Sequence, residues 1–288
     1  MDLLVETLDR LEILHQENSL PPAALSRVGL MPKWTAVIGT EEQCGITLNF
    51  TEHQHIFGKP HVDIDLLRSF IGRDLFTVAR YYTKSTSLQE RSIGASVVSA
   101  LSQPLLTQAS LASRGYKVLD TSLNFAGLLA PDDIAAMVGY GGYALNQVPG
   151  KCREFHVTDI RPKQDFQTVI IDSGIRNVPD NIIIHDAEEN PAVLSAATAV
   201  LITGSTLVNG TLKDLLKYTG KARLVGVWGP SASVIPDVLF EKGVNYLETY
   251  HMSNPAAFEA DVLNNQWDLK NVLPKTQKTL IITGQVNL

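Results

Sequence analysis

The apolar positions of the first hundred residues alternate between helical and strand spacing. Four leucines between positions 4 and 14 recur along one face of a helix, and residues 62–82 and 89–106 show the same spacing. Residues 34–50 form two apolar runs around a polar turn at residues 41–43, a pattern typical of a β-hairpin. The first part of the chain is therefore predicted to be α+β.

From about Asp133 onward, short apolar runs alternate with helical segments. Such alternation predicts βαβ units and a mostly parallel sheet covered on both faces, as in a Rossmann-like domain. We therefore expect an α/β protein with an α+β domain over residues 1–110 and a Rossmann-like domain over residues 111–288. The predicted strands are IAAMVGY (134–140), EFHVTDI (154–160), NIIIHDA (181–187), AVLITGS (199–205), RLVGVWGPS (223–231) and VNYLETY (244–250).

Composition narrows the classes of partner. A chain of 288 residues, 44% hydrophobic and 19% charged, is long enough for two cores. The net charge of -6 and the lack of a basic run argue against nucleic acid. The acidic N-terminal helix does not resemble a signal peptide, and no apolar stretch approaches the roughly 20 residues of a membrane span. We expect a cytoplasmic protein with a small-molecule partner and no membrane contact; the oligomeric state is left open, with a homodimer as one option.

Three loops follow predicted parallel strands and combine glycine with hydroxyl or amide groups. Ligands bind outside the carboxyl ends of strands in an open parallel sheet, so we expect these loops to form one ligand site. Glycine lets the backbone approach a ligand, and free N–H groups at a helix start attract polar or anionic groups, although a helix cap is the simpler explanation of any single loop. The candidate binding residues are Gly139, Tyr140 and Gly141 in the first loop, Thr203, Gly204, Ser205, Thr206, Asn209 and Thr211 in the second, and Gly229, Pro230, Ser231 and Ser233 in the third.

Asp159 ends the second predicted strand, about 20 residues after Gly139, which is the spacing at which a Rossmann acid meets a ribose hydroxyl. An acid that caps the loop before Arg161 is an equally good interpretation. Residues 139–143 lack the complete G-x-G-x-x-G motif, so a tight turn is the simpler interpretation of that loop. Gly210 would cost a helix about 1 kcal/mol relative to alanine. This predicts either a loop from Leu207 to Gly210, with the helix starting near Thr211, or close packing at Gly210.

Histidines and cysteines bear on the question of a metal. The segment TEHQHIFGKPH (51–61) has three histidines, but no cysteine or acid completes a familiar ligand spacing, so a solvated loop is preferred to a zinc site. Cys44 and Cys152 are far apart, which excludes a disulfide framework and a cysteine-only metal site. Imidazoles and carboxylates near the predicted crevice are better candidates for a transition metal. These metal candidates are His185, Asp186, Glu188 and His251.

Common catalytic motifs are missing from the sequence. It has no G-x-S-x-G elbow, no P-loop lysine and no HExxH, so hydrolase, NTPase and zincin chemistry lack their usual marks. Ser205 has no identifiable base beside it, and hydrogen bonding to a ligand is therefore preferred to a nucleophilic role. Whether the protein is an enzyme is left open at this point.

The combination of TGSTLVNGTLKDLL (203–216) with GPSASVIPDVLFEKGVNYL (229–247), preceded by MVGYGGY (137–143), resembles a heavy-metal chelation family of bacteria and archaea. The resemblance is clearest over roughly the last 160 residues, and ERSIG (90–94) fits the front part. It implies an enolase N-terminal-like α+β domain fused to a Rossmann-like domain, with a site between the two. It further implies binding or processing of a metal, a metal chelate or a small polar or anionic ligand in that cleft.

The resemblance extends to particular residues of the loops. The chain departs from the family pattern at residues 248–249, where a glycine is frequent, and in the glycine-rich loop at residues 140–143. The alternative is an enzyme that uses a nucleotide cofactor, S-adenosylmethionine or NAD, in the Rossmann crevice. The positions that match the family are Asp159, Thr203, Gly204, Asn209, Gly210, Thr211, Gly229, Pro230 and Ser231.

Overall fold

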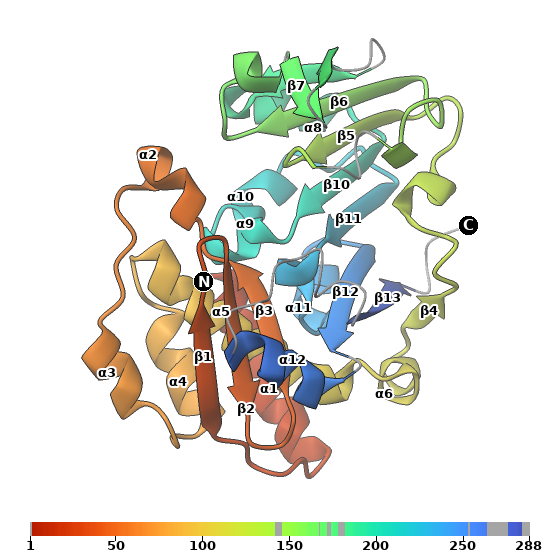
Figure 1. Ribbon diagram of the computed structural model, residues 1–288. Helices are drawn as coiled ribbons and strands as arrows, with labels where there is room; N and C mark the ends of the chain where they lie inside the picture. The colour runs from red at the N-terminus through yellow and green to blue at the C-terminus, as the bar shows by residue number, and fades with distance from the viewer. Residues whose placement is uncertain are drawn as a thin grey trace.

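The protein combines an N-terminal α+β part with a C-terminal part built on one large, mostly parallel sheet (Figure 1). The predicted fold class is therefore confirmed. None of the helices in the described residues has the length and apolar character that a membrane span requires. The computed structural model describes residues 2–141, 146–166, 168–171, 174–177, 182–252, 254–263 and 276–283.

In the N-terminal part, helices pack on a three-stranded antiparallel sheet with the order β1-β2-β3. The predicted hairpin is formed by β2 and β3, and the predicted first and last helices of this part are α1 and α5. The elements are α1 (Leu3–Glu17), β1 (Leu25–Leu30), β2 (Trp34–Gly39), β3 (Cys44–Leu48), η1 (Thr51–His53), α2 (Gln54–Phe57), α3 (Ile64–Ser69), α4 (Leu75–Tyr82), α5 (Leu88–Ser102), η2 (Gln103–Leu105) and α6 (Gln108–Ser113).

The spacing of residues 62–82 predicts a single helix, but the structure has two, α3 and α4. Gly72 lies between them with φ of +82°, a conformation that helices do not contain. Asp74 then starts α4 by accepting a hydrogen bond from the N–H of Thr77 at 3.0 Å. Apolar spacing alone does not reveal this break.

Small residues let α5 lie directly on β2 and β3. A Cβ atom on Gly45 of β3 would stand 1.9 Å from the carbonyl oxygen of Ser96 in α5. The Thr47 hydroxyl lies 2.8 Å from the Ser96 hydroxyl and donates to the Ser92 carbonyl at 2.9 Å. The small-residue pattern of this helix therefore has a packing role.

The large sheet has the order β4-β13-β12-β11-β10-β5-β6-β9. Neighbours from β12 to β9 are parallel, whereas β13 is antiparallel to both β12 and β4. All six predicted strands are confirmed. The elements are β4 (Lys117–Leu119), η3 (Phe125–Leu128), β5 (Ile134–Val138), β6 (Glu154–Asp159), η4 (Lys163–Phe166), β9 (Ile183–Asp186), η5 (Ala187–Glu189), α8 (Asn190–Ala196), β10 (Ala199–Thr203), α9 (Ser205–Val208), α10 (Leu212–Leu216), β11 (Leu224–Trp228), η6 (Pro230–Ala232), α11 (Asp237–Glu241), β12 (Tyr246–Met252), α12 (Pro255–Leu263) and β13 (Thr276–Ile282), with β7 (Thr168–Ile171) and β8 (Gly174–Asn177) paired separately.

Both faces of the large sheet are covered. One face packs on α8, α9, α10 and α11 in a core that continues into α1, α4 and α5 of the N-terminal part. The other face packs on η3 through Phe125 and on Val148. The direction of the strand order reverses between β5 and β10, because β6 and β9 continue on one side and β11 and β12 on the other. The strand ends at this reversal face the N-terminal part.

The chain returns to the N-terminal sheet near its end. Helix α12 lies beside β2 and β3 (Figure 1). Phe258 and Val262 of α12 pack with Trp34 of β2, and Arg27 Nε lies 2.6 Å from Glu259 Oε1. The expected domain boundary at residue 110 falls inside α6, and β4, which follows it, belongs to the large sheet. The division at this position stays a prediction.

Candidate functional site

A cavity of about 810 Å³ lies where the β2–β3 hairpin and η1 meet the large sheet. Its floor is formed by the residues that follow β5, β6, β10 and β11, so it is located at the reversal of strand order, where ligands bind in open parallel sheets. Residues of both parts therefore line one hollow.

Five aromatic residues line the cavity. Trp34 and Phe50 come from the N-terminal part, and Tyr140, Tyr218 and Trp228 come from the C-terminal part. Phe50 is buried and has φ of +61°, a left-handed conformation that costs a side chain such as phenylalanine about 1–3 kcal/mol. The surrounding fold holds this strained residue at the cavity. Flat apolar surfaces of this kind suit a ligand with a planar face.

The first predicted loop follows β5. Gly139 has φ of +91°, and a Cβ atom there would stand 2.7 Å from Thr203 Cγ2, so glycine lets the first two loops touch. Gly139, Tyr140 and Gly141 all line the cavity. Gly142 and Tyr143, which belong to the same predicted loop, lie outside the described residues.

Asp159 fixes the first loop against Arg161. Its Oδ2 accepts from the Tyr140 N–H at 2.7 Å and from Arg161 Nη2 at 2.9 Å, and its Oδ1 accepts from the backbone N–H and Nε of Arg161, both at 2.9 Å. Burial would raise the pKa of Asp159, but the hydrogen bonds from Arg161 and Tyr140 outweigh it and hold the pKa below its usual range. An ionised carboxylate offers about four acceptor positions. This carboxylate has filled them within the protein, which favours the capping interpretation over contact with a ribose.

Arg161, the partner of Asp159, also lines the cavity. Its guanidinium carbon lies 4.4 Å from the centre of the Phe166 ring, and its Nη2 also donates to the Tyr140 carbonyl at 3.2 Å. His53 of η1 also lines the cavity, and burial and then the positive charge of Arg161 lower the pKa of His53. Lys33 Nζ lies 3.5 Å from Glu52 Oε2 nearby. The charges at the cavity are thus mostly paired.

The second loop joins β10 to α9. Thr203, Ser205 and Thr206 line the cavity, and the Thr203 and Ser205 hydroxyls lie 3.2 Å apart. Thr206 donates its hydroxyl to the Thr203 carbonyl at 2.6 Å, which closes the turn. Gly204 is not among the lining residues. Its N–H donates to the Trp228 carbonyl at 2.8 Å. The backbone of Gly204 was expected to contact a ligand, but it contacts the third loop instead.

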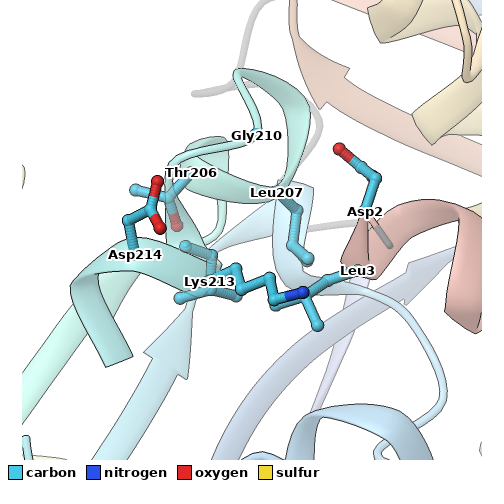
Figure 2. Close-up of a pocket in the computed structure, with 8 residues that line it drawn as sticks. Asp2, Leu3, Thr206, Leu207, Gly210, Lys213 and Asp214 are labelled. Carbon is cyan, nitrogen blue, oxygen red and sulfur yellow. The ribbon is translucent and has the colours of Figure 1, made fainter. Parts of the chain in front are cut away.

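A turn at residues 209–211 separates α9 from α10. The expected loop over residues 207–210 is therefore only partly right, because residues 207 and 208 belong to α9. Gly210 has φ of +80°, and Asn209 Oδ1 accepts from both the N–H and the hydroxyl of Thr211, at 3.1 and 2.7 Å. Asn209 and Thr211 line the cavity. Behind the turn lies a smaller hollow of about 160 Å³ (Figure 2). It is lined by Asp2, Leu3, Thr206, Leu207, Gly210, Leu212, Lys213 and Asp214.

Arg91, from the ERSIG segment at the start of α5, fastens this turn to the N-terminal part. Its Nε donates to the Val208 carbonyl at 2.5 Å, and its Nη2 lies 2.6 Å from Asp2 Oδ2. The side chain is nearly buried, and Asp2 caps α1 by accepting from the Leu4 N–H. Arg91 therefore sets the position of the second loop without lining the cavity.

The third loop follows β11. Gly229, Pro230 and Ser231 line the cavity, and the Ser231 hydroxyl accepts from the Leu48 N–H of β3 at 2.9 Å, which links the two parts at the cavity edge. Ser233 lies outside the cavity. It is buried and accepts from the Tyr250 N–H at 2.8 Å.

The four predicted metal ligands do not form one site, and this expectation needs correction. His185 is on β9 and His251 on β12, with four strands between them; at about 4.8 Å a step they are roughly 24 Å apart. Glu188 lines the cavity, whereas Asp186 accepts from the Lys163 N–H at 2.9 Å. In the part of the chain that the structure describes, no group of three or more His, Cys, Asp or Glu is arranged to hold a metal ion.

Several residues that line the cavity were not predicted as site residues from the sequence. Trp228 and Arg161 follow from the same strand-end rule as the predicted loops, since one ends β11 and the other lies two residues beyond β6. Trp34, Phe50 and His53 could not be placed there, because no local pattern reveals that the hairpin covers the strand ends.

Two family models match the chain, and both carry the description "Putative heavy-metal chelation": DUF4213 over residues 15–102 and DUF364 over residues 124–266. A DUF364 protein of unknown function from Desulfitobacterium hafniense has a similar structure, with a TM-score of 0.71 and 17% identity over 97% of this chain and 98% of its own. Another, from Pyrococcus horikoshii, gives a TM-score of 0.68 and 18% identity over 96% and 100%. At these identities the likeness concerns the fold. No curated protein matches the chain.

Proposed function

Because the chain belongs to the family described as "Putative heavy-metal chelation", we propose that it binds a small metal chelate with a planar face in the cavity between its two parts. The observation that carries this proposal is the composition of the cavity wall. Aromatic residues from both parts line the cavity together with hydroxyl-bearing residues at the strand ends. A planar chelate presents an apolar face to the rings and polar atoms at its edge to the hydroxyls.

The charges around the cavity support a chelate over a bare ion. Asp159 is saturated by Arg161 and the Tyr140 N–H, and Glu52 is paired with Lys33. A bare divalent cation needs several free carboxylate or imidazole ligands in one place. An organic ligand that already coordinates its metal needs hydrogen bonds and surface contact instead, which the Thr203 and Ser205 hydroxyls and the aromatic walls supply.

The nucleotide alternative has less support from the geometry. The Asp159 carboxylate accepts four hydrogen bonds inside the protein, so it has no position left for ribose hydroxyls. Gly139 is explained by its contact with Thr203. The presence of Asp159 and of Gly139 is therefore explained without a bound dinucleotide.

The 1:1 complex of zinc with pyridine-2,6-dicarboxylate, a flat neutral chelate with carboxylate oxygens at its edge, is a suitable probe. We expect calorimetry to detect binding of this chelate, and Ser205→Ala to weaken it about 2- to 12-fold, the effect of losing one hydrogen bond worth about 0.5–1.5 kcal/mol. The matched control is Ser113→Ala, in exposed α6, whose hydroxyl donates only to its own helix. Absence of binding to the unmodified protein, or equal affinity in the two variants, would count against the proposal.

A further inference from the structure

The Arg161 guanidinium is held in one orientation at the cavity between the two parts. Its Nε and Nη2 donate to the two carboxylate oxygens of Asp159, each at 2.9 Å, and Nη2 also donates to the Tyr140 carbonyl at 3.2 Å. The Phe166 ring lies against the guanidinium, with its centre 4.4 Å from the guanidinium carbon. An arginine fixed in this way loses little conformational freedom when a ligand binds to it.

Two hydrogen-bond donors of this side chain are left over. A guanidinium has five N–H groups, and three of them donate to Asp159 and Tyr140. The other two are on Nη1, and neither has an acceptor among the residues that the structure describes. Asp159 occupies the edge formed by Nε and Nη2, so Nη1 lies on the opposite side of the planar group. Because Arg161 lines the cavity and its side chain is 34% exposed, Nη1 is available to a bound molecule.

We propose that Arg161 Nη1 binds a carboxylate of the molecule that chelates the metal, so that the ligands of the cavity are metal complexes of carboxylate-bearing chelators. This inference rests on the proposed function and names the chemical group that the cavity recognises. A planar guanidinium matches the geometry of a carboxylate, and hydrogen bonds between charged groups are about twice as strong as those between neutral groups. Arg161 thus determines specificity, whereas Asp159 and Phe166 position it.

The other charges of the cavity favour a chelator that has already bound its metal. Among the described residues that line the cavity, carboxylates outnumber permanent positive charges, with Glu52, Asp159, Glu188 and Asp214 against Lys33 and Arg161. Such a lining repels a free dicarboxylate, which carries two negative charges. A divalent metal cancels those charges and leaves carboxylate oxygens at the edge of the complex for Arg161. The cavity therefore prefers the metal complex to the metal-free chelator.

Calorimetry with two flat zinc complexes tests the role of Arg161. The 1:1 complex with pyridine-2,6-dicarboxylate has carboxylates at its edge, whereas the 1:1 complex with 1,10-phenanthroline has none. Arg161→Lys keeps the positive charge, but an ammonium group that pairs with Asp159 has no second nitrogen for a ligand. We expect this variant to bind the dicarboxylate complex about 10- to 100-fold more weakly, the effect of losing a hydrogen bond between charged groups. Its affinity for the phenanthroline complex should not change.

The matched control is Arg68→Lys, in an exposed pair with Asp65, which should leave both affinities unchanged. Thermal unfolding checks that each variant is folded. We also expect the unmodified protein to bind metal-free pyridine-2,6-dicarboxylate at least about 10-fold more weakly than its zinc complex, because of the repulsion from the cavity lining. Tighter binding of the metal-free acid would overturn the preference for the metal complex.

The possible results separate this inference from the proposed function. If Arg161→Lys weakened both zinc complexes equally, Arg161 would only hold the first loop in place. If it left the affinity for the dicarboxylate complex unchanged, Arg161 would not contact the ligand. Either result would overturn the inference and leave the proposed function standing. Failure of both zinc complexes to bind the unmodified protein would overturn the proposed function, and this inference with it.

Discussion

Gly204→Val is expected to destabilise the protein by about 3 kcal/mol or more, because a side chain cannot be inserted there without moving the backbone. A Cβ atom on Gly204 would stand 2.3 Å from the backbone nitrogen and 2.7 Å from the Cβ of Ala232. These atoms belong to η6, so the second and third loops would be forced apart. Urea denaturation measures the change in the free energy of unfolding.

Gly220→Val is the matched control for this variant. Gly220 does not adopt a positive φ, and a Cβ atom there meets nothing within 4 Å. We expect its free energy of unfolding to change little. If the two valine variants were equally stable, the close contact between the second and third loops would not exist as described.

Asp159→Ala is expected to cost about 3 kcal/mol of stability, because it leaves the Arg161 guanidinium and the Tyr140 N–H without their shared acceptor. Asp159 is 5% exposed and Arg161 is 34% exposed, so water recovers part of the loss, which places the effect at the lower end of the range for buried pairs. Asp65→Ala, which breaks the exposed pair with Arg68, is the control and should change stability by less than about 1 kcal/mol.

Acid should reduce the difference between the unmodified protein and Asp159→Ala. The pKa of Asp159 is lowered on folding, so its contribution to stability is present above the unfolded value of about 3.9 and is lost as the pH falls through the folded value. Unfolding curves at pH 7 and near pH 3 measure this. A difference that stayed constant would mean that the ionised carboxylate does not stabilise the loop.

The sequence predicts the sheet well because the central parallel strands β5, β10 and β11 are short apolar runs buried on both faces. The same rule predicts that the loops containing Gly139, Thr203 and Gly229 meet, since parallel strand ends share one edge. It does not give the order of the strands, and that order separates His185 from His251. The strand order depends on contacts between segments that are distant in the sequence, and local periodicity carries no information about such contacts.

Glycines and charged residues were predicted less well than the loops that contain them. Gly204 was expected to admit a ligand, but the space that its missing side chain leaves is occupied by Ala232. The sequence position of Asp159 fits both a cap and a ribose contact, whereas the four hydrogen bonds that its carboxylate accepts favour the cap. The hydrogen bond between the rings of His156 and His185 depends on the register of β6 and β9, which places Thr158 opposite His185 and Ile183 opposite His156. Register of this kind is set by the whole sheet.

The central claim is that the cavity between the two parts holds a small chelate against the strand-end loops. Native mass spectrometry of the protein mixed with zinc pyridine-2,6-dicarboxylate tests it most directly, with Ser205→Trp as the variant that fills the cavity from the second loop. We expect one bound chelate per chain in the unmodified protein and none in Ser205→Trp. Equal binding by a folded Ser205→Trp, or no bound chelate in the unmodified protein, would contradict it.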